Sequence, residues 1–117
     1  MTDAAEWGPA FGGATIGMPG PDGGTIARDE EHPRGARLTL ETGGGRAPYV
    51  LTCAVDGWMV HLRLFSDEAE AQRAYEETRP ALRELAQTLP EGGARRAGAA
   101  ALPAAHQAMA RFMSRYP

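Results

Sequence analysis

The chain has 117 residues, of which 43% are hydrophobic and 23% are charged, and its 12 basic and 15 acidic side chains give a formal net charge of −3. A chain of this length holds one ordinary core, and its composition is that of a globular protein rather than a disordered one. The acidic balance argues against a general nucleic-acid binder, which needs a basic surface to displace counterions from phosphates.

All 12 basic residues are arginine, and the sequence contains neither lysine nor asparagine. Because the codons of the missing residues are AT-rich, we expect a high-GC bacterial genome. The single cysteine, Cys53, cannot form an intrachain disulfide, which suits a reducing cytoplasm. No apolar run approaches the roughly 18 residues of a membrane helix. Residues 1–7 contain two acidic residues, Asp3 and Glu6, and do not have the pattern of a secretory signal. We therefore expect a cytoplasmic protein with no membrane partner.

Residues 1–24 are rich in glycine and proline, which interrupt helices and long strands. The same segment nevertheless contains four large apolar side chains, Trp7, Phe11, Ile16 and Met18. A solvated linker rarely contains so many of them. We expect an irregular N-terminal arm, with a short extended piece at residues 14–18, whose apolar residues lie against a neighbouring surface.

Residues 25–65 show the alternation of an antiparallel β meander with three to four strands, and segments 25–28 and 37–42 are its first candidates. The run Asp-Glu-Glu-His at 29–32 is interpreted as a solvated turn rather than a metal site, because adjacent ligands rarely converge on one ion. The glycines at 43–45 lack the lysine and the following helix of a phosphate loop, so they predict a mobile hairpin loop. We expect neither a metal nor a cofactor.

The strongest local signal is Asp56-Gly57 between the β-rich runs 49–55 and 58–65, which is typical of a two-residue hairpin turn. This turn predicts the following opposed pairs: Val55 with Trp58, Cys53 with Val60, Leu51 with Leu62, and Tyr49 with Leu64. All eight side chains are apolar or aromatic, so we expect them to share the core face of the sheet.

Residues 66–90 predict a long helix capped by Ser66 or Asp67 and ended by Pro90. Its apolar seam lies at positions 71, 75, 78, 82, 85 and 89, and Pro80 on the opposite side predicts a kink. Residues 91–101 form a linker, and residues 103–115 predict a shorter C-terminal helix. The order predicts an α+β domain over residues 25–117: an antiparallel meander packed on one face by the long kinked helix, plus the C-terminal helix.

The predicted hairpin register places Thr52, His61 and Arg63 on the second face of the sheet, with Arg37 alongside on the neighbouring strand. A histidine and one or two arginines on a sheet face can hold an anionic group. This pattern predicts one function, a small anionic-ligand binder or a weak enzyme. The other interpretation is that these polar residues belong to a contact surface.

The same face carries Val50, Met59 and Phe65, which are too apolar to leave in water. Three covers remain open at this point: the N-terminal arm, the C-terminal helix, or a second copy of the chain. The sequence offers no catalytic residues that combine nucleophile, base and orienting group. We therefore expect a non-enzymatic module that self-associates, as a homodimer, or binds a protein partner. Nucleic-acid binding by the arginine-rich segment 95–115 is the weaker alternative.

Overall fold

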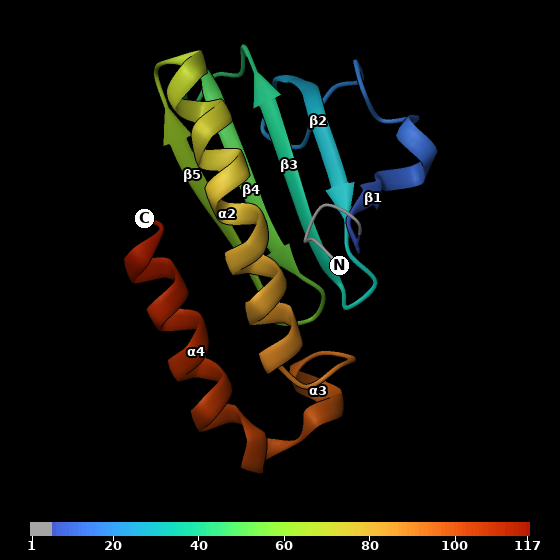
Figure 1. Cartoon of the computed structure of the whole chain (residues 1–117), viewed down its shortest axis with the longest axis vertical. Coiled ribbons are helices and arrows are strands. Elements are labelled where there is room, and N and C mark those ends of the chain that lie inside the picture. Colours follow the sequence, from blue (N-terminus) through green and yellow to red (C-terminus); the bar gives the residue numbers. More distant parts are fainter. Residues whose placement is uncertain (1–5) are drawn as a thin grey trace.

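The computed structural model describes residues 6–117 and consists of a sheet followed by helices (Figure 1). The elements are β1 (Gly8–Pro9), a 3-10 helix η1 (Ala10–Gly13), β2 (Thr25–Glu31), β3 (Ala36–Thr42), β4 (Tyr49–Val55), β5 (Met59–Phe65), α2 (Glu68–Thr88), α3 (Ala94–Ala97), a 3-10 helix η2 (Ala99–Ala101) and α4 (Leu102–Arg115). Residues 1–5, on which the expectation about a secretory signal partly rests, lie outside the described residues.

The five strands form one sheet in the order β1-β2-β3-β4-β5, and every neighbouring pair is antiparallel. Figure 1 shows α2 lying across one face of the sheet, with α4 beside α2. The α+β prediction is confirmed, with five strands rather than three to four. The additional strand is the short β1, which the N-terminal arm contributes, whereas the predicted extended piece at 14–18 consists mainly of turns.

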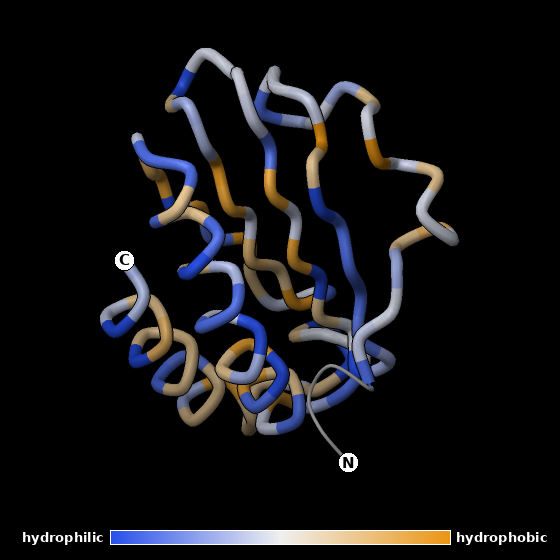
Figure 2. Tube along the Cα trace, turned by 45° about the horizontal axis from the view of Figure 1, so that its top comes forward, coloured by the Kyte–Doolittle hydropathy of each residue, from blue (hydrophilic) through white to orange (hydrophobic). Residues whose placement is uncertain are grey.

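The long helix α2 begins where the sequence predicts, because the Asp67 carboxylate accepts a hydrogen bond from the Glu70 backbone N–H at 2.9 Å. It runs through Pro80 as one helix. All six seam positions are buried, namely Ala71, Tyr75, Thr78, Leu82, Leu85 and Leu89. They pack on the inward side chains of β3 and β4, and in Figure 2 the strands alternate between hydrophobic and hydrophilic residues, as a sheet with one core face requires.

The β4–β5 hairpin is present, but its register differs from the prediction by one residue. Val55 pairs with Met59, Cys53 with His61, Leu51 with Arg63 and Tyr49 with Phe65. The turn therefore contains three residues, with Trp58 included, rather than two. Because strand side chains alternate, this shift turns every side chain of β5 to the other face.

Tertiary contacts explain the longer turn. The Trp58 indole N–H donates to the Pro90 carbonyl oxygen at 2.8 Å, and the Gly57 carbonyl accepts from the Ala94 N–H at 3.1 Å. Gly57 also lies so close to Gly93 that a Cβ on Gly57 would come within 2.7 Å of the Gly93 Cα. The turn is thus docked on the segment that follows α2, a contact that the local sequence does not encode.

The register shift reverses the predicted faces of β5. Met59 and Phe65 now pack against the core beneath the helices, while Val60 is 73% exposed and Leu64 is 50% exposed on the far face. The expectation that Leu62 belongs to the core is therefore wrong. We call the helix-covered side of the sheet the core face and the other side the second face.

Candidate functional site

His61 and Arg63 lie on the core face, not on the second face as predicted. The His61 Nε2 atom is 2.7 Å from the carbonyl oxygen of Tyr116. Arg63 is 9% exposed, donates from Nη1 to the Thr78 hydroxyl at 2.6 Å, and donates from Nε to the Pro117 carbonyl at 3.3 Å. These two side chains therefore fasten the segment after α4 to the sheet.

Arg37 and Thr52 lie on the second face, so the four predicted ligand residues do not form one site. The Arg37 guanidinium makes a bidentate pair with Asp29, from Nε to Oδ1 at 2.9 Å and from Nη2 to Oδ2 at 2.6 Å. The Thr52 hydroxyl is buried and has no hydrogen-bond partner among the described residues. The predicted common surface rested on the two-residue turn, and the three-residue turn separates its members.

Asp29 is a buried anchor rather than part of a solvated turn, because β2 continues through Glu31. Besides the Arg37 bonds, its carboxylate accepts hydrogen bonds from the hydroxyls of Thr15 at 2.8 Å and Thr39 at 3.0 Å. Burial raises the pKa of Asp29, but the hydrogen bonds outweigh burial and hold this pKa below its usual value. Asp29 thereby ties the N-terminal arm to the second face.

A second buried carboxylate, Glu41 on β3, holds the loop that precedes β2. It is 1% exposed and accepts hydrogen bonds from the backbone N–H groups of Asp22 and Gly24, each at 3.1 Å. A Cβ on Gly20 would collide with the Glu41 side chain, so this loop needs glycine there. The arm therefore covers the β2–β3 half of the second face. The sequence left open whether the arm, the C-terminal helix or a second copy covers this face, and for this half the cover is the arm.

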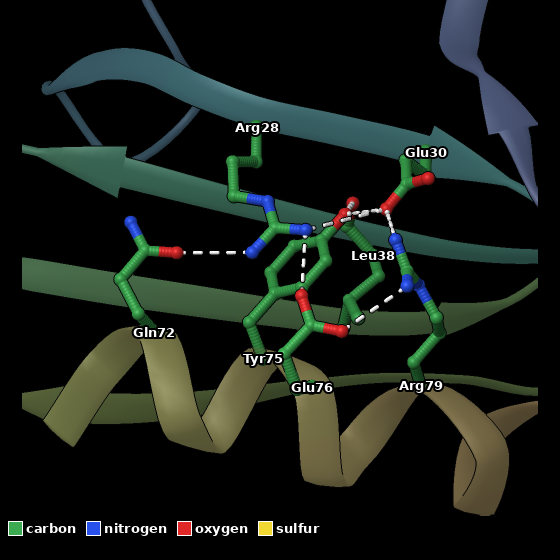
Figure 3. A network of polar contacts seen from close by, with 7 residues as sticks. All are labelled: Arg28, Glu30, Leu38, Gln72, Tyr75, Glu76 and Arg79. Atoms are coloured by element: carbon green, nitrogen blue, oxygen red, sulfur yellow. Dashed lines mark hydrogen bonds and ion pairs between the residues drawn. The ribbon is translucent and has the colours of Figure 1, made fainter. Parts of the chain in front are cut away.

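A polar network joins β2 to α2 on the core face (Figure 3). The buried Tyr75 hydroxyl donates to Glu30 Oε1 at 2.6 Å, and Arg79 donates to the same oxygen at 2.5 Å. The Arg28 guanidinium lies 3.7 Å from the centre of the Tyr75 ring and pairs with Glu76 at 2.8 Å. This network is not among the sites that the sequence predicts. Its only signal was the two-residue spacing of Arg28 and Glu30, which places both on one face of a strand.

The charged and polar groups of this network are paired with one another by hydrogen bonds and ion pairs. Burial and the Glu30 hydrogen bond raise the pKa of Tyr75 far above its usual value. Burial raises the pKa of Glu30 as well, but the bonds from Tyr75 and Arg79 outweigh it and lower this pKa overall. A neutral phenol bound to a paired carboxylate is a structural clamp between sheet and helix, since no group in it is poised to transfer a proton near neutral pH.

A cleft of about 630 Å³ lies beside β1, at the turn between β2 and β3, and His32 lines it. His32 is 6% exposed, its Nε2 atom is 2.9 Å from Glu6 Oε2, and its Nδ1 atom accepts the Arg34 backbone N–H at 3.1 Å. Since Nδ1 accepts, the proton of a neutral ring lies on Nε2 and points at Glu6. Both ring nitrogens are thus engaged within the chain, and the imidazole links Glu6 of the arm to the turn between β2 and β3.

The β4–β5 half of the second face is partly open to solvent, most of all at Val60 and Leu64. We call the following residues the β4–β5 patch: Thr52, Ala54, Val60, Leu62 and Leu64. None of its side chains is ionisable. Of the predicted interface residues, Met59 and Phe65 lie on the core face, and Val50, although on the second face, is only 1% exposed. The apolar surface that the sequence predicts is therefore present on this face, but other residues form it.

Within residues 6–117, no group of three or more His, Cys, Asp or Glu side chains is arranged to hold a metal ion. In the same range, no helix has the length and hydropathy needed to cross a membrane. Comparisons with protein-family models, with curated proteins and with solved structures find no match.

Proposed function

We propose that the protein is a non-enzymatic interaction module whose contact surface is the β4–β5 patch. The observation that carries the proposal is the exposure of Val60 (73%) and Leu64 (50%) on strand positions within the β4–β5 patch, whose five side chains are not ionisable. Exposed apolar patches on a folded domain commonly mark protein–protein contacts. The arm lies over the β2–β3 half of this face, where it bonds to the buried carboxylates of Asp29 and Glu41, and it leaves the β4–β5 patch open.

The chemistry of the remaining polar groups supports a binding role. Cys53 is buried, and burial raises its pKa to about 12, which disfavours the reactive thiolate. His32 and the Tyr75 network are engaged within the chain, as described above. We place the protein in a reducing compartment, the cytoplasm, because its single cysteine needs no oxidising environment.

Site-specific photo-cross-linking in the cells that make the protein tests this function. With the photoreactive residue p-benzoylphenylalanine in place of Val60, we expect one discrete adduct, because the exposed patch is held against a partner. The same residue in place of Gln107, which is exposed on α4, is the matched control and should give none. The adduct should disappear when Leu64→Asp is added, since a desolvated charge opposes association. No adduct at position 60, or equal adducts at both positions, would contradict the proposal.

A further inference from the structure

We infer that the partner is a second copy of this chain, packed face to face on the β4–β5 patch about a two-fold axis. The inference rests on the proposed function and adds the identity of the partner and the geometry of the contact. Two observations support it: the charge distribution around the patch and the arrangement of large and small side chains within it.

The charge distribution favours an identical partner. The chain carries a net charge of −3, so two copies repel each other over most orientations. The patch contains no ionisable side chain. Of its neighbours on the same face, Val50 is apolar, and Arg37, which lies opposite Ala54 on β3, is paired with the buried Asp29. Two like-charged chains can therefore meet here without placing like charges in contact, whereas a basic partner would need acidic residues on this surface.

The side chains of the patch also complement their own copy. The row on β5 is large, with Val60, Leu62 and Leu64, while Ala54 and Thr52, which are paired with Val60 and Leu62 on β4, are smaller. Leu64 is paired with Val50, which is only 1% exposed. A two-fold axis places the large row of each copy over the small row of the other, as an isologous contact requires. Sheets that pack face to face in this way lie about 10 Å apart with nearly aligned strands.

The other symmetric arrangement, pairing of the two β5 edges, is less favoured by the position of α4. Figure 1 shows the end of α4 beside β5, and the His61 and Arg63 hydrogen bonds hold it there on the core face. A second copy joined at this edge would bring its own helices to the space that α4 occupies. The second face has no helix over β4 and β5, so it is open to a flat partner.

Sedimentation equilibrium across the micromolar range tests the inference. We expect a wild-type mass of twice 12.4 kDa and a Leu64→Asp mass of 12.4 kDa, with a dissociation constant raised at least about 30-fold. The control is Ile16→Asp, because Ile16 is also 50% exposed but lies on the arm, and its mass should match the wild type. Circular dichroism should show both variants folded, since neither side chain is in the core.

A second variant separates the two symmetric arrangements. Ala54→Arg fills the row of small side chains on β4, so it should dissociate a face-to-face dimer but leave a dimer paired at the β5 edges intact. A dimer that resists Ala54→Arg overturns the inference. A monomeric wild type also overturns it, and in that case a position-60 adduct containing a different protein would leave the interaction function standing, whereas no adduct would remove both.

Discussion

The orientation of β5 can be tested by truncating two leucines that the sequence places together and the structure separates. Leu51 is fully buried on the core face, whereas Leu62 lies half-buried on the second face. Leu51→Ala leaves a cavity in a packed core and should lower the free energy of unfolding by about 2–5 kcal/mol. Leu62→Ala removes atoms that border solvent and leaves no enclosed cavity, so it should cost about 1 kcal/mol or less.

Urea unfolding followed by circular dichroism measures both values, with equal slopes against denaturant as the check that the two variants unfold alike. Each titration is run at two protein concentrations, because a dimer contributes a concentration-dependent part to the apparent stability. The two variants are compared by the part of the unfolding free energy that does not depend on protein concentration. If Leu62→Ala then costs as much as Leu51→Ala, Leu62 lies in the core and the three-residue turn is wrong.

Two further predictions concern buried groups. Because hydrogen bonds hold the pKa of Asp29 below its usual value near 3.8, its stabilisation is complete above that pH and is lost as the pH falls through the lower folded-state pKa. Asp29→Asn should therefore destabilise the chain in urea titrations at pH 7, and its difference from the wild type should shrink at pH 3; an unchanged difference would contradict this account. Cys53, whose burial raises its pKa to about 12, should react slowly with an aromatic disulfide reagent in the native protein and rapidly in urea, as followed by absorbance. Equal rates in the two states would show that the thiol is accessible.

The elements that local chemistry specifies could be predicted from the sequence. The α2 seam, its Asp67 cap and the stop at Pro90 follow from helical spacing and from the backbone groups left free at helix ends. The hairpin at Asp56-Gly57 follows from the need for a positive φ, which Gly57 adopts at 75°. The expectation that the apolar residues of the N-terminal arm lie against the domain holds only for Trp7, which is 6% exposed. It is wrong for Phe11, Ile16 and Met18, which are 67%, 50% and 52% exposed.

The sequence could not decide which way β5 faces. Hydrophobicity favours the wrong register, because it would turn the apolar Val60, Leu62 and Leu64 to the core, whereas the observed register turns His61 and Arg63 there together with Met59 and Phe65. The observed register is stabilised by hydrogen bonds to residues far away in the sequence, from Trp58 to the Pro90 carbonyl and from Arg63 to the Thr78 hydroxyl. The register of β5 determines which of its side chains are exposed, and therefore where the candidate contact surface lies.

The same reason explains the run at 29–32, whose charges predicted a turn. Asp29 can be buried in a strand only because Thr15, Arg37 and Thr39 supply donors from other parts of the chain. Burying a charged side chain without partners costs several kcal/mol. When only the neighbours in sequence are known, a charged side chain is therefore predicted to be exposed. Local spacing thus determined the two long helices and the presence of the hairpin, but not the length of its turn. Its tertiary structure decided which faces and which charges are buried, because those depend on hydrogen-bond partners far away in the sequence.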